Sequence, residues 1–181
     1  MIYQVVTFGH EILRQKAMPV AKITDELRRL VQDMLESMYA AKGVGLAAEQ
    51  VGHTESVCVI DVPHDAEKEA CRAENAAIPM PLVLINPQVV ASEGKQRNEE
   101  GCLSFPEIGA PITRADKVTV TYTDLTGAQQ TVSARGLLSR AIQHEIDHLS
   151  GILLVDKMSP MQKLAVAGQL KRLQKQAAQE V

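Results

Sequence analysis

The sequence predicts a single domain of the α+β class, in which short, mostly antiparallel strands surround one buried helix. The chain has 181 residues, enough for one domain with a substantial hydrophobic core. Short strand-like runs, one hairpin pattern and three separate helical patterns occur along it, without the regular alternation of a parallel α/β fold. We therefore treat residues 1–181 as one domain.

The first helix is predicted in residues 24–43. Thr24 is a suitable N-cap and Gly43 is the expected stop. Apolar residues recur at helical spacing between them. They are Leu27, Leu30, Val31, Met34, Leu35 and Met38. The following stretch of small residues, GVGLAAEQVG, is interpreted as a loop.

Residues 56–62 (SVCVIDV) and 82–90 (LVLINPQVV) predict strands, and residues 117–134 predict a hairpin with DLTG at its turn. Residues 63–81 are polar and small, and we interpret them as a surface excursion that can hold a short helix. A second helix is predicted in residues 136–149, with Gly151 as its stop. The third is predicted in residues 160–181. Its apolar side consists of Met161, Leu164, Leu170 and Leu173.

Composition excludes several classes of protein. The net charge of −3 gives no overall electrostatic signature of nucleic-acid binding, so we expect no DNA partner. We expect no membrane-spanning helix and no signal peptide, because no apolar stretch is long enough and the first residues lack a basic start. Three widely spaced cysteines do not form a disulfide pattern, so we expect reduced thiols and a cytoplasmic location.

The stretch QHEIDHL in the second helix carries the strongest chemical signal. His144 and His148 are four residues apart, so they project from one face of the helix. Two imidazoles at this spacing can hold one divalent metal, and Glu145 can act on metal-bound water. The alternative is a pair of histidines that are solvated or hydrogen-bonded in a core. Asp147 is interpreted as a solvated charge in preference to a contact that supports a ligand.

Catalytic metal sites usually have a third protein ligand. Cys102, in NEEGCLSFPE, is the best candidate because a thiolate binds zinc or iron strongly. The alternative for Cys102 is a buried structural thiol. Cys58 is expected to be such a thiol, and Cys71 is expected to be exposed.

Three stretches in this order resemble the signature motifs of the peptide deformylase family. They are GVGLAAEQ (43–50), EGCLS (100–104) and QHEIDH (143–148). The resemblance implies hydrolysis of the formyl group of N-formylmethionine on newly made polypeptides, with release of formate. It implies one divalent metal held by Cys102, His144 and His148. Ferrous iron is the expected native ion, and zinc, nickel or cobalt can replace it.

The resemblance also implies roles for the surrounding residues. Glu145 is the general acid and base for attack of metal-bound hydroxide on the formyl carbon, and the side chain of Gln50 and the backbone N–H of Leu103 stabilise the oxyanion. Gly43 and Gly45 allow close approach of the peptide backbone. The candidates for the walls of the methionine pocket are Val44, Leu137 and Ala141, for which ordinary core packing is an equal alternative.

Two positions depart from the family pattern near the expected substrate-binding side. Gly109 stands where several relatives have a substrate-side Arg, for which Arg114 or Arg140 can compensate, and Glu49 adds a negative charge near the site.

The basic terminal helix suggests a weak contact with the ribosome, against the alternative of a solvated helix packed on its own domain. Two alternatives to a deformylase are another H-E-x-x-H metallopeptidase and a non-enzymatic binding module stabilised by metal.

Overall fold

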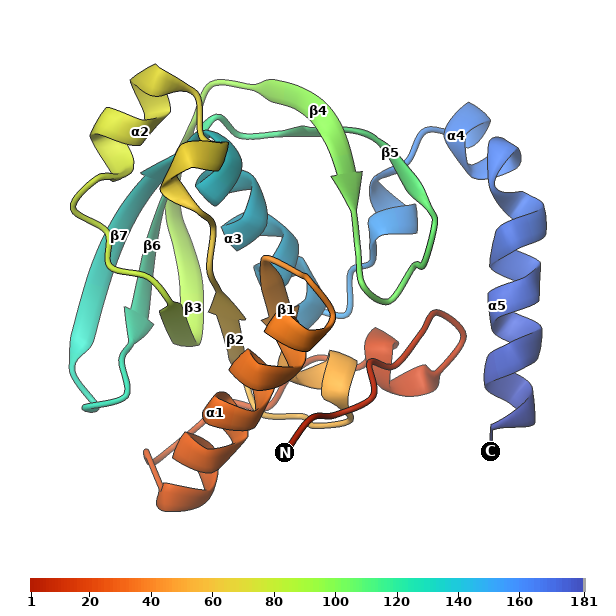
Figure 1. Ribbon diagram of the computed structural model, residues 1–181, viewed down its shortest axis with the longest axis horizontal. Coiled ribbons are helices and arrows are strands. Elements are labelled where there is room, and N and C mark those ends of the chain that lie inside the picture. The colour runs from red at the N-terminus through yellow and green to blue at the C-terminus, as the bar shows by residue number, and fades with distance from the viewer. Residues whose placement is uncertain (181) are drawn as a thin grey trace.

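A five-stranded antiparallel sheet organises the protein in the computed structural model, which describes residues 1–180 (Figure 1). The strand order is β1-β2-β3-β6-β7. The bounds are β1 Gly45–Ala47, β2 Val57–Ile60, β3 Leu82–Glu93, β6 Lys117–Thr123 and β7 Gln129–Arg135. A separate two-stranded sheet consists of β4 (Gln96–Gly101) and β5 (Gly109–Arg114).

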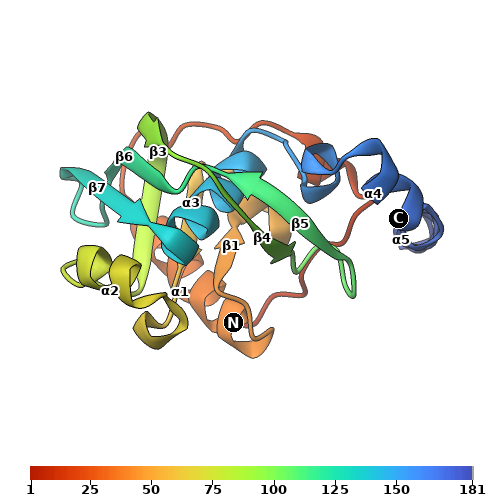
Figure 2. The ribbon, with the colours of Figure 1, turned by 90° about the horizontal axis from the view of Figure 1, so that it is seen from above.

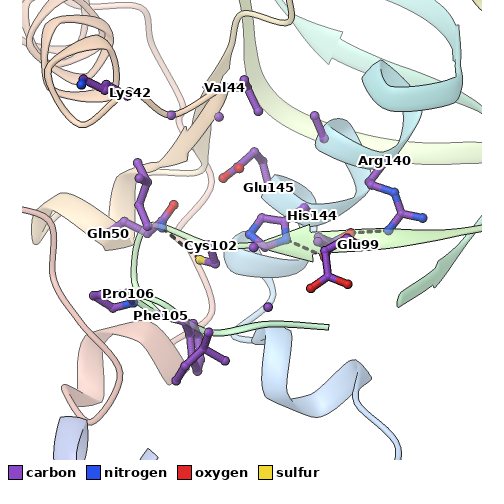
Figure 3. A pocket seen from close by; sticks show the side chains of 18 of the residues that line it. Lys42, Val44, Gln50, Glu99, Cys102, Phe105, Pro106, Arg140, His144 and Glu145 are labelled. Carbon is purple, nitrogen blue, oxygen red and sulfur yellow. Dashed lines mark hydrogen bonds and ion pairs between the residues drawn. The ribbon is translucent and has the colours of Figure 1, made fainter. Parts of the chain in front are cut away.

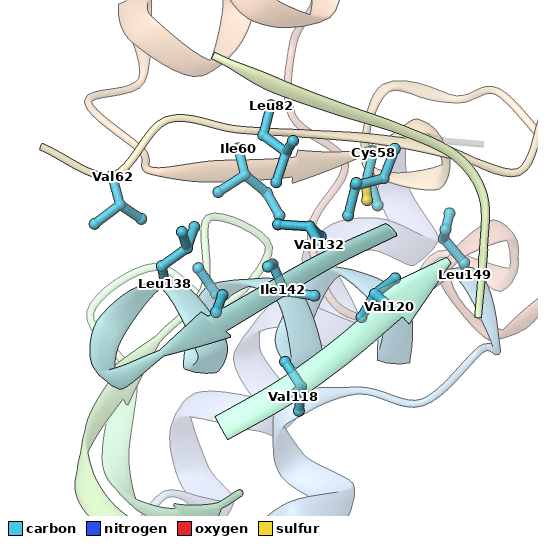
Figure 4. Close-up of a cluster of buried hydrophobic side chains, with 14 of the residues drawn as sticks. Cys58, Ile60, Val62, Leu82, Val118, Val120, Val132, Leu138, Ile142 and Leu149 are labelled. Carbon is cyan, nitrogen blue, oxygen red and sulfur yellow. The ribbon is translucent and has the colours of Figure 1, made fainter. Parts of the chain in front are cut away.

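Two helices cover opposite faces of the sheet at β2. Helix α3 (Gly136–Leu149) packs through Leu138 and Ile142 on the face that carries Cys58 and Ile60 (Figure 4). Helix α1 (Asp25–Ala40) packs in the cluster that contains Val57 and Val59. The whole of β2 is therefore buried, which explains its continuous apolar sequence.

The remaining elements lie at the two ends of the molecule. Helix α2 (Glu69–Asn75) lies beside β7, and α4 (Pro160–Ala165) and α5 (Ala167–Gln179) lie at the opposite end (Figures 1 and 2). A second apolar cluster joins the β4–β5 sheet to α5 through Phe105, Ile112 and Leu173. Four short 3-10 turns complete the structure: η1 Glu11–Arg14, η2 Ala48–Val51, η3 His64–Ala66 and η4 Leu154–Lys157.

The predicted α+β class is confirmed, and the helix at 136–149 and the β6–β7 hairpin lie where the sequence places them. The N-cap is also confirmed, since Thr24 Oγ1 accepts a hydrogen bond of 3.2 Å from the backbone N–H of Leu27. Helix α1 ends at Ala40, and Lys42, with φ of 57°, reverses the chain before Gly43. Cys58 is buried as expected.

Several local predictions were wrong. Residues 43–52 contain β1 and η2 and are not simply a loop. The β4–β5 hairpin was not predicted, because in β4 only Glu100 is buried and no apolar alternation marks the strand. Cys71 is buried, not exposed, because α2 packs against β7.

The C-terminal prediction needs a similar correction. Helical structure is interrupted at Val166, so α4 and α5 replace one continuous helix. Met161 and Leu164, assigned to its apolar side, are 83% and 78% exposed. The prediction extended to residue 181, which lies outside the described residues. Within residues 1–180, no helix combines the length and the apolar character needed to cross a membrane.

Candidate active site

Helix α3 and the chain that follows β4 bring the three predicted metal ligands together. The sulfur and nitrogen atoms that Cys102, His144 and His148 offer all lie within 4.8 Å of one another. Cys102 Sγ is 3.3 Å from His148 Nε2, and the centroids of the two imidazole rings are 4.9 Å apart. Cys102, His144 and Glu145 surround one cavity (Figure 3).

The donor atoms suit a divalent metal. His144 Nδ1 is 2.8 Å from Glu100 Oε2, which leaves Nε2 to face the cluster. Burial, reinforced by the charges of His144 and Arg114, lowers the pKa of His148, so this imidazole is neutral as a ligand must be. Burial opposes charge on His144, but nearby Cys102, Glu100 and Glu145 raise its pKa well above the ordinary value. These acidic neighbours favour a cation at this position.

Glu100 is the centre of a buried ion cluster behind His144. It accepts hydrogen bonds from Arg114 at 3.0 Å and 2.7 Å and from Arg140 at 2.8 Å. Burial alone would raise the pKa of Glu100, but the bonds to His144 and Arg114 outweigh it and lower the pKa well below the ordinary range. Glu100 therefore remains a carboxylate that orients the imidazole of His144.

Asp147 belongs to the same cluster, so its interpretation as a solvated charge was wrong. Its carboxylate accepts a hydrogen bond from Arg114, and Lys157 Nζ lies 3.8 Å away. The side chain of Arg114 is only 4% exposed. A buried guanidinium needs carboxylate partners, and Asp147 is the second partner of Arg114 besides Glu100.

Glu145 projects into the cavity beside β1. One of its oxygens, Oε2, is buried without a hydrogen-bond partner among the described residues. Burial raises the pKa of Glu145 to about 7. A Cβ atom added at Gly45 would lie 2.3 Å from Glu145 Oε1, and one at Gly43 would lie 2.7 Å from Leu103 Cδ1. The two glycines therefore make room for the side chains opposite them.

Gln50 is held in one orientation. Its Oε1 accepts a hydrogen bond of 3.0 Å from the N–H of Ala47, and its Nε2 donates one of 3.0 Å to Ser104 Oγ. The same Nε2 is 3.6 Å from Cys102 Sγ. These contacts fix the amide plane and place its N–H group beside the candidate metal ligand Cys102.

The cavity has a volume of about 660 Å³. All the predicted site residues except His148 line it: Gly43, Val44, Gly45, Gln50, Cys102, Leu103, Leu137, Ala141, His144 and Glu145. Sequence reasoning missed Phe105 and Ile108, which also line it. Both follow Cys102 closely in the chain, but no periodic pattern marks them.

The region around Gly109 differs from the expectation. A Cβ atom at this position would lie 2.9 Å from Glu99 Oε1, so Glu99 occupies the adjacent space. Arg114 and Arg140 both bind Glu100, and Arg140 also donates to the carbonyl of Ile112. These two guanidinium groups are committed to buried partners, so neither is free to replace a side chain at position 109.

Glu49, beside Gln50, is fully buried, and within the described part of the chain neither of its carboxyl oxygens has a hydrogen-bond partner. Burial, with a smaller contribution from the charge of Glu145, raises the pKa of Glu49 to about 8. At neutral pH this carboxyl is mainly protonated. It does not add the full negative charge that its sequence position suggests.

One thiol and two imidazoles converge beside a buried carboxyl, and a cavity lies in front of them. Three protein donors with one open side define the site of a metallohydrolase. The sequence model of the family described as polypeptide deformylase matches residues 2–164. The chain belongs to this family, and its assignment as a metal-dependent hydrolase with the predicted fold is confirmed.

Individual relatives agree with this assignment. The peptide deformylase of Desulfitobacterium hafniense is 47% identical over 156 residues, which cover 86% of this chain and 94% of the relative. The crystal structure of a peptide deformylase from Legionella pneumophila matches with a TM-score of 0.83 and 35% identity over 98% of each chain. The peptide deformylase from Synechococcus elongatus in complex with actinonin has a TM-score of 0.80 and 39% identity, covering 92% of this chain and 87% of that one.

Removing the charge of Glu100 should weaken metal binding. In Glu100→Gln, an amide faces His144 and two arginines, so the imidazole loses its anionic partner. We expect metal affinity to fall about 10- to 100-fold, measured by competition with a chromophoric chelator. Glu99→Gln changes the exposed neighbour on the same strand and should keep the wild-type affinity. Equal affinities for Glu100→Gln and the wild type would contradict this role.

Glu49 should make stability depend on pH. Between about pH 5 and pH 8 the folded protein retains a proton on Glu49 that the unfolded chain has released, so the free energy of unfolding falls as pH rises. The slope from this group approaches about 1.4 kcal/mol per pH unit. Glu49→Gln should remove it, as urea titrations across this pH range would measure. The exposed substitution Glu11→Gln should preserve the wild-type slope, and identical slopes in wild type and Glu49→Gln would refute the assignment.

Proposed function

We propose that the protein hydrolyses the formyl group of N-formylmethionine at the start of newly made polypeptides and releases formate. The observation that carries this proposal is the convergence of Cys102, His144 and His148 around a cavity into which Glu145 projects. Membership of the deformylase family supports the substrate class. We also propose that the enzyme acts in the cytoplasm.

The metal would be held by Cys102 Sγ, the Nε2 atom of His144 and the Nε2 atom of His148. When bound, it supplies a Lewis acid that lowers the pKa of water and polarises a carbonyl oxygen. We propose ferrous iron as the native ion, with zinc, nickel or cobalt as substitutes. The mixed thiolate and imidazole donor set is compatible with iron and with zinc.

Glu145 moves the protons in this proposal. Its pKa of about 7 is suited to taking a proton from the attacking water and giving it to the departing amine. The water oxygen forms a bond to the formyl carbon, and the bond from that carbon to the peptide nitrogen then breaks. Formate and a free amino terminus result, so no further reactant is needed.

Gln50 and Leu103 stabilise the negative charge on the formyl oxygen. The bonds of Gln50 to Ala47 and Ser104 fix its amide before the substrate arrives. The backbone N–H of Leu103 is adjacent to the ligand Cys102. Donors fixed in advance are effective because little reorganisation is needed when charge develops.

The peptide lies along β1, and its first side chain enters the cavity. β1 is an edge strand of the five-stranded sheet, so Gly45 lies where backbone pairing with an extended peptide is available. Gly43, two residues before β1, allows the peptide to approach closely. Leu137 and Ala141 are the proposed inner walls for the methionine side chain. Val44, 41% exposed, lies at the rim.

The C-terminal helices are proposed to make a weak contact with the ribosome. Lys171, Arg172 and Lys175 are exposed on α5, and Lys163 is exposed on α4. Basic side chains in such an arrangement can neutralise phosphates of ribosomal RNA. This contact would place the enzyme close to its substrates as they are made.

Replacing Glu145 by glutamine should remove the proton carrier and preserve the shape of the site. We expect the rate of formate release from formyl-Met-Ala-Ser to fall about 100- to 10,000-fold with the metal content unchanged. The control is Glu107→Gln, which alters an exposed carboxylate that lines the same cavity. Activity of Glu145→Gln within tenfold of the control, or cleavage of internal peptide bonds without formate release, would contradict the proposal.

Binding to ribosomes should depend on salt and on α5. We expect the double variant Lys171→Ala and Lys175→Ala to co-sediment more weakly with ribosomes than wild type. Wild-type affinity should fall about tenfold or more between about 50 and 200 mM salt. The control pair Lys22→Ala and Lys95→Ala removes the same charge from exposed positions elsewhere. Absent or salt-independent co-sedimentation would exclude an electrostatic contact.

A further inference from the structure

The polar excursion of residues 63–81 contacts the beginning of the helix that carries the active site. Glu67 lies between η3 and α2, and its side chain is buried. Glu67 Oε2 accepts a hydrogen bond of 3.0 Å from the N–H of Leu137, and Oε1 accepts one of 2.6 Å from the N–H of Leu138. These are backbone groups of the first turn of α3.

Helix α3 has no cap from its own N-cap residue. That residue is Arg135, whose side chain makes no capping hydrogen bond in the described structure. The first N–H groups of a helix have no partner within the helix, and a side chain at the N-cap usually satisfies the second and third. Glu67 bonds to these two groups from about 70 residues earlier in the chain. Its negative charge also suits the positive end of the helix.

Asn75 holds this arrangement together. Its amide accepts a hydrogen bond of 2.9 Å from the N–H of Arg135 and donates one of 2.8 Å to the carbonyl of the same residue. It also lies 3.3 Å from Glu67 Oε1. Both Glu67 and Asn75 are buried. The two side chains therefore fix the junction between β7 and α3.

Gly136 permits the close approach of Glu67. Its φ is 66°, and a Cβ atom added there would lie 2.5 Å from Glu67 Oε2 and 2.8 Å from Cys71 Sγ. A larger residue at this position would displace the carboxylate. Glu67 can therefore reach the first turn of α3 only because residue 136 is a glycine.

The capped turn forms a wall of the active site. Leu137 lines the large cavity that contains Glu145, and it also lines a smaller cavity of about 230 Å³ that Glu67 and Cys71 border. Leu137 therefore separates the pocket for the first side chain from the excursion. Its backbone N–H is bonded to Glu67, and its side chain lines the large cavity.

We propose that Glu67 is a positioning residue for selection of the first side chain. It fixes the first turn of α3 from outside the active site, so that Leu137 forms a defined wall of the methionine pocket. This inference rests on the proposed deformylase function. Without the carboxylate, the first turn loosens and Leu137 loses its contact with a long side chain. Glu145 and the two histidine ligands lie two to three turns further along the helix.

The test is a ratio of specificities. A methionine side chain reaches Leu137 and an alanine side chain does not, so damage confined to this wall lowers kcat/KM for formyl-Met-Ala-Ser more than for formyl-Ala-Ala-Ser. The ratio of the two values does not depend on the fraction of active enzyme. For Glu67→Gln we expect this ratio to fall about tenfold, the discrimination that contact with one methylene group in an apolar pocket typically supplies.

Amide hydrogen exchange gives the structural readout on the same samples. The Leu137 and Leu138 amides should exchange faster in Glu67→Gln than in the wild type. If Glu67→Gln does not fold, Glu67→Asp provides the test, because it retains the charge and retracts the carboxylate by one methylene. It should lower the ratio in the same direction by a smaller factor. Glu69→Gln, an exposed change of the same kind on the excursion, should leave the ratio and the exchange rates unchanged.

Two results would overturn the role of Glu67. One is an unchanged Met-to-Ala ratio in a folded Glu67 variant, even with faster exchange of both amides. The other is wild-type protection of Leu137 and Leu138 in that variant. Absence of formate release from both peptides by the metal-loaded wild type would instead overturn the proposed function, and with it the pocket role assigned to Leu137.

Discussion

The carboxylate of Glu100 is the interaction on which the rest of the site depends. It belongs to β4, and it binds Arg114 of β5 together with Arg140 and His144 of α3. Charges removed from water are tolerated only when they are paired and hydrogen-bonded, so this cluster forces the small hairpin and the helix into one relative position. Cys102 directly follows the last residue of β4. The same cluster that orients His144 therefore also brings the Cys102 sulfur to it.

The parts of the site that depend on local sequence could be predicted. Helical spacing places His144 and His148 on one face, and the apolar pattern of residues 136–149 is sufficient to define the helix. The β6–β7 hairpin also follows from a local alternation and a turn sequence. Ligand chemistry made Cys102 the best candidate for a third ligand, with a structural thiol as the alternative. For Gln50, resemblance to a known family was needed, because no local rule relates it to a helix about 90 residues later.

The parts that depend on partners distant in the sequence could not be predicted. Asp147 resembles a solvated charge until Arg114 is found beside it. The strand that contains Glu100 is otherwise exposed and polar, so its single buried carboxylate gives no periodic signal. Residues 63–81 are polar on average, yet the excursion contributes two buried side chains that bond to another element. Composition describes the average of a segment, whereas these roles belong to single residues.

The long-range origin of the site has a consequence for the order of folding. Gln50 bonds to Ser104 across 54 residues, Glu100 to His144 across 44, and Glu67 to Leu138 across 71. Contacts of this separation form late, since loop closure must precede them, and α3 is synthesised after Gln50, Glu67, Glu100 and Cys102. The candidate donor atoms therefore cannot converge before α3 has been made. An enzyme that belongs to a family acting on nascent polypeptides thus completes the geometry of its own candidate metal site only after the last of these segments has been added.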